Sequence, residues 1–402
     1  MAFWMFSYFR INFVARNLMR IGIDARFYGP IGKGLGRYTQ KLIENMEKIS
    51  AQAGPASGGK NQYFVFLKKE NFDEYQPQNE NFQKVLADFK WYGFAEQLKF
   101  PRLLKKYELD LVHFPHFNVP IFYFGKFIVT IHDLILLNFP TIRSSTLSPI
   151  LYWLKFTAYK MVISSAVHRS CRIIAVSNFT KKDILKNYPR IPEEKVVVTY
   201  EACDDYCLFN FRKDDKILPR YGISKPYLLY VGNVYPHKNP ERLVMAMKKI
   251  EKENECLRLV FVGGKDYFYE RLRALVKEDK IGNIVFAGFV PDYDLDALFR
   301  NALAYVRPSL HEGFELPGLE AMSRGVPVLV SDYPCSREIL GESASYFDGK
   351  DVKSIADAIR NISTDEILRQ ELIRKGYEQA KKYSWKKMAE ETRSLYGKIK
   401  MR

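Results

Sequence analysis

The chain has 402 residues, of which 47% are hydrophobic and 27% charged. This composition is typical of a folded globular protein, and the length suggests about two or three domains. Because no run of about 18 uncharged apolar residues occurs, we expect no transmembrane helix.

The 62 Lys and Arg exceed the 46 Asp and Glu, which gives a net charge of +16. This excess favours a phosphorylated substrate or an anionic membrane surface as partner. Nucleic acid is not expected, since zinc-finger spacing and RNP-like motifs are absent from the sequence.

Two local features indicate the cellular compartment. The five Cys are odd in number and scattered, which is typical of reduced cytosolic thiols. Residues 1–18 are rich in aromatic residues and Met but have no small-residue cleavage site, so a secretory signal is not expected. Since 19–24 has the pattern of a first strand, we interpret 1–18 as an extension from an upstream start. An interfacial membrane anchor is the alternative.

Apolar runs that predict strands alternate with helical patterns along the whole chain. The first series is Ile21–Asp24, Tyr63–Leu67, Leu111–His113, Phe127–His132, Ile173–Val176 and Val196–Thr199. The second series is Tyr227–Val231, Leu257–Val262, Ile284–Phe286, Ala304–Arg307, Val328–Ser331 and Ala344–Phe347. This alternation predicts an α/β protein with two doubly wound parallel sheets, and therefore two Rossmann-like domains.

The two series set the expected domain boundaries. We assign 19–205 to the first domain and 206–384 to the second, with a C-terminal helix within 385–402. In doubly wound sheets, ligands bind beyond the carboxyl ends of the strands. The motifs described below all follow a predicted strand, so we expect them to lie at these ends.

The most informative motif is His-Glu-Gly-Phe-Glu-Leu-Pro-Gly-Leu-Glu-Ala-Met at 311–322. Pro317 is predicted at the first position of a helix, where its missing N–H costs nothing. Glu312 then lies in the preceding loop, and Glu320 lies one turn inside the helix. The free N–H groups of a helix start attract anions. The arrangement suits a ligand that has sugar hydroxyls and a phosphate.

This stretch resembles the E-x7-E motif of the retaining glycosyltransferases of family 4. The resemblance implies the GT-B architecture, in which two Rossmann-like domains face a central cleft and a C-terminal helix packs back on the first domain. It also implies that Glu312 stabilises charge at the anomeric carbon of the sugar and that Glu320 binds the donor ribose. Backbone N–H groups near Phe314 and Leu316 are implied to hold sugar hydroxyls and phosphate.

Two motifs of the first domain extend the resemblance. The glycine-rich stretch 29–38 resembles the GIGRY loop of the family, so Gly34 and Gly36 are expected to lie near the donor phosphates. A plain mobile loop is the alternative. His132, in a T-x-HD motif, is implied to lie close to the sugar. We interpret His113 and His116, after another strand, as residues that line the cleft.

The second domain contributes two further motifs. Residues 231–239 resemble VG-x-x-x-P-x-KN, in which Lys238 is implied to hold the donor diphosphate and neutralise the leaving group. Many family members have Arg at the position of Asn233, so Lys238 is expected to matter more here. The loop 288–291 is implied to border the nucleobase through Phe289 and Val290.

The resemblance also implies the reaction. We expect a nucleotide-diphosphate sugar as donor, with GDP-mannose the first choice because the sub-pattern resembles mannosyltransferases of polysaccharide assembly. The acceptor is expected to be a glycan or a lipid-linked glycan. Since Lys238 with the helix start can stabilise a diphosphate, no metal or other cofactor is expected.

We expect the protein to be cytoplasmic. Peripheral contact with the inner face of the cell membrane is a further expectation. Glu96–Tyr107 is helix-like on either side of Pro101 and carries four Lys and Arg, which suits anionic lipid. An ordinary basic surface explains the same charges equally well.

Two other classes of function stay open at this point. A nucleotide-sugar epimerase of the same architecture would change the donor without an acceptor. A non-catalytic protein that binds glycans or membranes would retain the fold without the chemistry. A dehydrogenase is disfavoured because Arg37 replaces the third glycine of the dinucleotide fingerprint.

Overall fold

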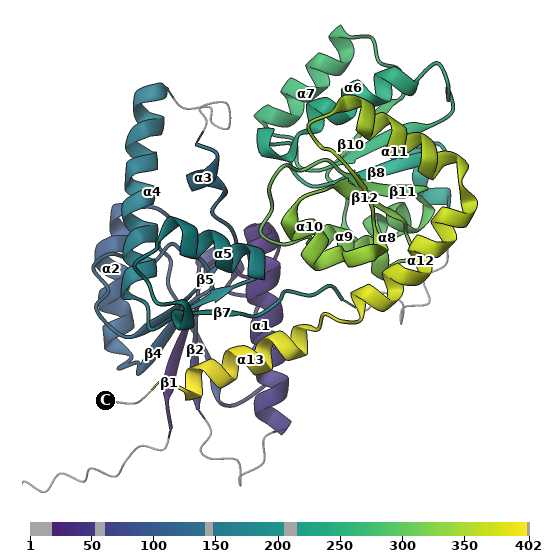
Figure 1. Ribbon diagram of the computed structural model, residues 1–402. Coiled ribbons are helices and arrows are strands. Elements are labelled where there is room, and N and C mark those ends of the chain that lie inside the picture. The colour runs from purple at the N-terminus through teal and green to yellow at the C-terminus, as the bar shows by residue number, and fades with distance from the viewer. Residues whose placement is uncertain (1–17, 53–60, 141–147, 205–214, 400–402) are drawn as a thin grey trace, which may run out of the picture. The chain divides into compact units, whose positions relative to one another are not determined.

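A computed structural model describes residues 18–52, 61–140, 148–204 and 215–399 (Figure 1). The chain divides into two compact units. Unit 1 comprises Met1–Thr130, Val162–Ile173 and Ala389–Arg402, and unit 2 comprises Ile131–Met161 and Ile174–Met388. The predicted extension 1–18, apart from its last residue, and the predicted boundary at 205–206 lie outside the described residues.

The first sheet has seven strands in the order β3-β2-β1-β4-β5-β6-β7. Their bounds are β1 (Arg20–Asp24), β2 (Gln62–Leu67), β3 (Phe82–Leu86), β4 (Leu111–Phe114), β5 (Phe127–Ile131), β6 (Arg172–Ala175) and β7 (Val196–Val198). Strands β1 to β5 pair in parallel. The sequence pattern missed only β3 in this sheet. This strand lies at the sheet edge and buries only Phe82 and Val85 fully, so its apolar signal is weak.

Six helices of the described residues accompany these strands. They are α1 (Lys33–Gln52), α2 (Phe94–Lys106), α3 (Ile135–Asn138), α4 (Pro149–Arg169), α5 (Asn178–Asn187) and the C-terminal α13 (Trp385–Gly397). Helix α2 is helical on either side of Pro101, as predicted, and it continues through that residue. Within the described residues, no helix has both the length and the apolarity needed to span a bilayer.

A chain of buried hydrogen bonds ties α13 to the first sheet within unit 1. The Tyr396 hydroxyl lies 2.7 Å from His113 Nδ1, and His113 Nε2 lies 2.8 Å from Thr130 Oγ1. Tyr38 of α1 lies 3.2 Å from the same threonine oxygen. His113 is fully buried, so its interpretation as a cleft-lining residue was wrong. Its two nitrogens satisfy core hydroxyls from distant segments.

The second sheet has six parallel strands in the order β10-β9-β8-β11-β12-β13. Their bounds are β8 (Tyr227–Val231), β9 (Arg258–Val262), β10 (Ile284–Gly288), β11 (Ala304–Arg307), β12 (Val328–Ser331) and β13 (Ser345–Phe347). All six coincide with predicted strands to within two residues at each end. Their continuous apolar sequences suit a sheet that is covered on both faces.

Helices cover both faces of this sheet (Figure 1). Their bounds are α6 (Pro240–Ile250), α7 (Tyr267–Glu278), α8 (Asp292–Asn301), α9 (Leu316–Ser323), α10 (Pro334–Leu340), α11 (Val352–Thr364) and α12 (Glu366–Ala380). Leu228 packs in the core with α6, α7 and α11, while the next residue, Leu229, packs in the core with α8, α9 and α10. This alternation follows from the strand period of two.

Short 3-10 helices complete the described secondary structure. They are η1 (Pro30–Gly32), η2 (Lys69–Asn71), η4 (Glu193–Lys195), η6 (Asp215–Tyr221), η7 (Pro236–Lys238) and η8 (Gly341–Ser343).

Candidate active site

The E-x7-E segment joins the end of β11 to α9 in unit 2. The helix begins at Leu316, so Pro317 occupies its second position. The sequence predicts the first position, so this expectation was wrong by one residue. Glu312 lies in the preceding loop, and Glu320 lies within the helix with a buried side chain, as the sequence indicated.

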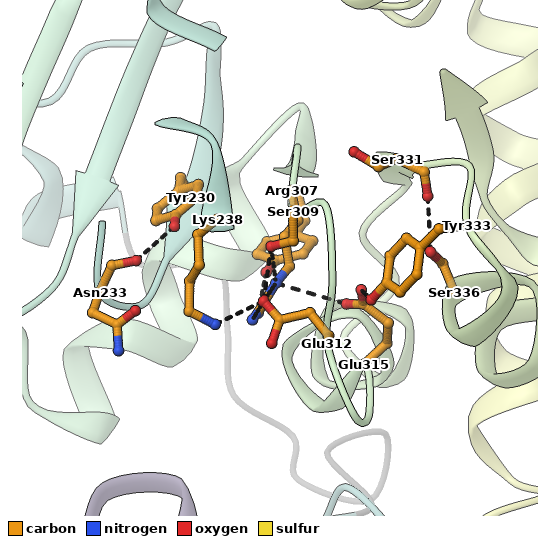
Figure 2. A network of polar contacts seen from close by, with 11 residues as sticks. Tyr230, Asn233, Lys238, Arg307, Ser309, Glu312, Glu315, Ser331, Tyr333 and Ser336 are labelled. Carbon is orange, nitrogen blue, oxygen red and sulfur yellow. Dashed lines mark hydrogen bonds and ion pairs between the residues drawn. The ribbon is translucent and has the colours of Figure 1, made fainter. Parts of the chain in front are cut away.

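The carboxylate of Glu312 is held through one oxygen. Its Oε1 accepts hydrogen bonds from Lys238 Nζ at 2.7 Å, from Arg307 Nη2 at 2.6 Å and Nε at 3.2 Å, and from Ser309 Oγ at 2.8 Å. Figure 2 shows Lys238 approaching this carboxylate from one side, away from Glu315. Three donor side chains therefore fix the orientation of Glu312.

The network continues from Arg307 toward α10. Arg307 Nε lies 3.8 Å from Glu315 Oε2, and the Tyr333 hydroxyl donates to Glu315 Oε1 at 2.5 Å (Figure 2). Arg307 Nη1 also donates to the Tyr305 hydroxyl at 3.3 Å. Arg307 therefore lies between two buried carboxylates and is much closer to Glu312 than to Glu315.

These positions determine the protonation of both carboxylates. Burial alone would raise the pKa of Glu312, but the positive charges of Arg307 and Lys238 hold this pKa well below its ordinary value. Burial raises the pKa of Glu315, and the more distant Arg307 only partly offsets that effect. Glu312 is thus the carboxylate that stays ionised.

Lys238 lies in an environment that weakens its hold on a proton. Burial lowers the pKa of the Lys238 ammonium, and the positive charge of Arg307 lowers it further, while Glu312 opposes both effects. The neighbouring His237 is affected in the same direction, since burial and then Lys238 lower the pKa of its imidazole to about 4. His237 is therefore neutral at pH 7 and adds no positive charge to the site.

Two hydrogen bonds of its neighbours hold Lys238 beside the E-x7-E segment. Leu310 N donates to His237 O at 2.8 Å, and Asn239 Nδ2 donates to Pro308 O at 3.0 Å. Asn239 has a left-handed backbone conformation with φ of 58°, which Asn tolerates better than most residues. This turn ends η7 and starts α6, and it fixes the point from which Lys238 reaches Glu312.

His132 lies immediately after β5 and is oriented by a carboxylate. Its Nδ1 lies 2.7 Å from Glu201 Oε1, which favours a proton on Nδ1. The backbone of the same residue lies against Gly313, because a Cβ at Gly313 would be 1.7 Å from His132 O. The Ser177 and Thr180 hydroxyls both donate to Gly313 O. Glycine next to Glu312 is therefore required by close approach of another chain segment.

The remaining donor-site candidates of unit 2 differ in exposure. Asn233 follows β8, and its backbone oxygen accepts from the Tyr230 hydroxyl at 2.6 Å. Phe289 is 76% exposed, whereas Val290 and Phe314 are buried in the core. Phe289 is therefore free to contact a ligand through its ring, while Val290 and Phe314 can do so only through their backbones. Leu316, whose side chain packs against the same core, lies at the first position of α9.

Gly34 and Gly36 belong to unit 1 and lie in the first turn of α1. The prediction that they lie in a loop was therefore wrong. At Gly36 a Cβ would lie 2.0 Å from Gly29 O, so the helix start folds directly onto the preceding turn. Gly34 has open space around its Cβ position. Of these two glycines, only Gly36 is thus required by packing.

The sequence did not identify Arg307, Ser309 or Glu315 as site residues. Arg307 was recognised only as the last residue of a predicted strand and Glu315 only as part of the motif at 311–322, while Ser309 lies outside that motif. A signal was present, since a charged residue closing an apolar strand needs a partner when it is buried. Within the described residues, groups of three or more His, Cys, Asp or Glu that could hold a metal ion are not found.

Comparisons with known proteins place the chain in a family. The family model described as "Glycosyl transferases group 1" matches residues 213–379, and "Glycosyltransferase Family 4" matches residues 67–205. Among curated proteins, the O-antigen chain mannosyltransferase B of Escherichia coli is 29% identical over 297 residues, which cover 73% of this chain and 75% of the relative. The O-antigen chain mannosyltransferase RfbU of Salmonella typhimurium is 28% identical over 277 residues, covering 69% and 71%.

Solved structures share the fold. Sucrose-phosphate synthase from Thermosynechococcus elongatus superposes with a TM-score of 0.71 at 20% identity and covers 94% of this chain and 98% of its own. WaaG, a glycosyltransferase of lipopolysaccharide biosynthesis, gives a TM-score of 0.70 at 15% identity, covering 94% and 100%. The two family models together span more than half of the residues. The chain therefore belongs to the family 4 glycosyltransferases and has their GT-B fold.

Proposed function

We propose that this glycosyltransferase transfers a sugar from a nucleotide-diphosphate donor with retention of anomeric configuration. The main support is that the protein holds the Glu312 carboxylate through only one of its two oxygens. All its hydrogen bonds within the described residues go to Oε1, so Oε2 is the oxygen left for a ligand. An ionised carboxylate held in this way can accept hydrogen bonds from a sugar and stabilise positive charge at its anomeric carbon.

The proposed reaction is a front-face substitution. The bond between the anomeric carbon and the diphosphate oxygen breaks, and the acceptor hydroxyl oxygen forms a bond to the same face of that carbon. The acceptor proton passes to the leaving phosphate, and the products are a glycoside and a nucleoside diphosphate. His132, oriented by Glu201, is assigned to a sugar hydroxyl.

Lys238 is assigned to the donor diphosphate. Its ammonium has three N–H donors and uses one on Glu312, so two are available for phosphate oxygens. The start of α9, near Phe314 and Leu316, offers free backbone N–H groups to the same anion. Glu320 is assigned to the ribose. Lys238 and the helix start supply positive charge without a metal ion, so we propose that the transfer needs no metal.

Mannose from GDP-mannose is the proposed donor sugar, and a growing or lipid-linked glycan is the proposed acceptor. Support comes from the relatives, several of which are O-antigen or serotype-specific mannosyltransferases. We accordingly propose a role in assembling a bacterial polysaccharide.

A cytoplasmic enzyme that contacts the inner face of the membrane would meet such an acceptor. The basic residues of α2 support this location, since Lys99, Arg102, Lys105 and Lys106 are all exposed, while Phe100 and Leu104 on its other side are buried. An exposed basic face of this kind suits anionic headgroups.

The donor can be identified by thermal stabilisation with GDP-, UDP- and ADP-sugars. GDP-mannose is expected to raise the melting temperature most. A larger shift with a UDP- or ADP-sugar would overturn the choice of base. Turnover in excess EDTA tests the metal, and turnover abolished by EDTA and restored by Mg²⁺ would contradict the metal-free assignment.

Product analysis tests the reaction itself. With acceptor, NMR of the product should show the anomeric configuration of the donor, and an inverted product would exclude the front-face route. Without acceptor, the nucleotide sugar should be recovered unchanged. Conversion to an epimeric nucleotide sugar would show an epimerase instead.

A further inference from the structure

The first half of α4 exposes large apolar side chains. Ile150 is 78% exposed, Trp153 47%, Leu154 64% and Met161 60%. From Ile163 onward the apolar residues of the same helix are buried. One end of the helix is therefore anchored in the protein, while the other presents apolar surface to its surroundings.

These exposed apolar side chains share one face of the helix. Trp153, Leu154 and Met161 follow Ile150 by three, four and eleven positions, and residues at these spacings lie on the same side of an α-helix. Only Tyr152 is buried among residues 149–161. A surface helix normally turns such an apolar face toward the protein core. Exposed apolar surface of this kind marks an interaction site.

The charges of α4 narrow the choice of partner. From Pro149 to Arg169 the sequence contains no Asp or Glu, and the exposed half carries Lys155 and Lys160, both exposed. Long Lys side chains can extend along apolar surface to place their ammonium groups at phosphates. Trp and Tyr side chains, such as Trp153 and Tyr159, favour the boundary between lipid chains and water.

We propose that residues 149–161 of α4 insert into the interface of an anionic lipid bilayer. A second copy of this chain is a poorer partner for the same surface. In a symmetric contact of two such helices, Lys155 and Lys160 would face their own copies with no carboxylate from the helix to pair with them.

This inference deepens the proposed membrane contact, on which it rests for its biological sense, but it concerns a different helix. The basic residues of α2 provide attraction to headgroups, which acts over about a Debye length. The apolar half of α4 adds burial in the lipid itself. The two contributions can be separated because burial persists at high salt and attraction does not.

Vesicle sedimentation tests the apolar contribution. The full chain is mixed with phosphatidylglycerol vesicles, and with phosphatidylcholine vesicles for comparison, at high and low salt. The double variant Ile150→Ser/Leu154→Ser should bind the anionic vesicles at least about tenfold more weakly than the unchanged chain. Ile367→Ser is the matched control, since Ile367 is 83% exposed on α12, and it should bind as the unchanged chain does.

Charge reversal tests the electrostatic contribution. Lys155→Glu/Lys160→Glu should lose the preference for phosphatidylglycerol. The control Lys252→Glu/Lys277→Glu changes the net charge equally at two exposed positions outside α4 and should retain it. Equal loss in both variants would show that only total charge matters, which would overturn the role of α4.

Fluorescence locates the inserted segment. Lipids brominated near the headgroup should quench a Trp signal that is lost in Trp153→Phe. Absence of that quenching, or equal vesicle binding by Ile150→Ser/Leu154→Ser and the unchanged chain, would overturn the proposal. Sedimentation equilibrium without lipid should show the same oligomeric state for the unchanged chain and for Ile150→Ser/Leu154→Ser. A dimer that only the unchanged chain forms would assign the surface to a second copy instead.

Failure of this proposal is distinguishable from failure of the proposed transfer. Turnover with a soluble acceptor in the absence of vesicles should be the same in the α4 variants and the unchanged chain. Vesicle binding without any turnover would contradict the transfer alone, and turnover without vesicle binding would contradict the membrane contact alone.

Discussion

Arg307 donates two hydrogen bonds to one oxygen of Glu312, at 2.6 Å and 3.2 Å from Oε1. Both side chains are buried, so the pair is shielded from water. The guanidinium thereby keeps Glu312 ionised and leaves its other oxygen available. The buried cation at Arg307 supplies positive charge next to Lys238 from a different strand.

Replacing Arg307 by Met should shift the acid limb of the pH profile of kcat/KM to higher pH. The depressed pKa of Glu312 means that its ionised form stabilises the fold above its unfolded pKa, and that this stability is lost as the pH falls through the folded pKa. Without Arg307 the folded pKa rises, so protonation begins at higher pH. Removing one partner of a buried pair should also cost about 3–5 kcal/mol of unfolding free energy. Arg307→Lys should restore part of the shift, and an unmoved acid limb in Arg307→Met would contradict the role of Arg307.

Glu312→Gln should lower kcat by at least about a hundredfold, by analogy with the loss of one preorganised charge-stabilising group. The variant leaves the Lys238 and Arg307 cations without their carboxylate, so its melting temperature should fall as well. Ser309→Ala is the control, because it removes one neutral donor to Oε1 and leaves the charge. Its turnover should stay within about tenfold of the unchanged chain, in line with one hydrogen bond. Unchanged turnover in Glu312→Gln would remove Glu312 from the mechanism.

Lys238→Ala should weaken binding of the nucleoside diphosphate by roughly ten- to a hundredfold, the range for hydrogen bonds to a charged group. Isothermal titration calorimetry with GDP measures this directly. The nucleoside guanosine lacks the phosphates, so any residual affinity for it should be the same in both proteins. A loss of guanosine affinity as large as that for GDP would show a general disruption of the site.

Gly313→Ala should destabilise unit 2, because the new Cβ would lie 1.7 Å from the backbone oxygen of His132. A backbone atom cannot move aside as the end of a side chain can, so the segment that carries Glu312 must shift. Gly264→Ala is the matched control in the same unit, where no atom lies within 4 Å of the added Cβ. Thermal denaturation should show a lower melting temperature for the first variant only, and equal values would contradict the close approach.

The sequence itself determined the parallel α/β folding and the position of the main motif. Strands of the second sheet, such as Tyr227–Val231 and Ala304–Arg307, were predicted with their observed bounds. They are short apolar runs that would expose hydrophobic surface in any other arrangement. Glu312 and Glu320 could be assigned to a loop and a helix because Pro317 restricts the local backbone. These features depend on neighbours in the chain, so they can be read from it directly.

Only the tertiary structure decided which side chains meet. The approach of Lys238 and Arg307 to the same oxygen of Glu312 joins the loop after β8 to the end of β11 and the loop that follows it. The burial of His113 depends on Tyr396, 283 residues later in the chain. Strand β3 forms by pairing with β2, since its own sequence is too polar to predict it. The physical reason is common to all three cases: hydrogen bonds and ion pairs depend on distance and direction in space, and local sequence restricts neither across distant segments.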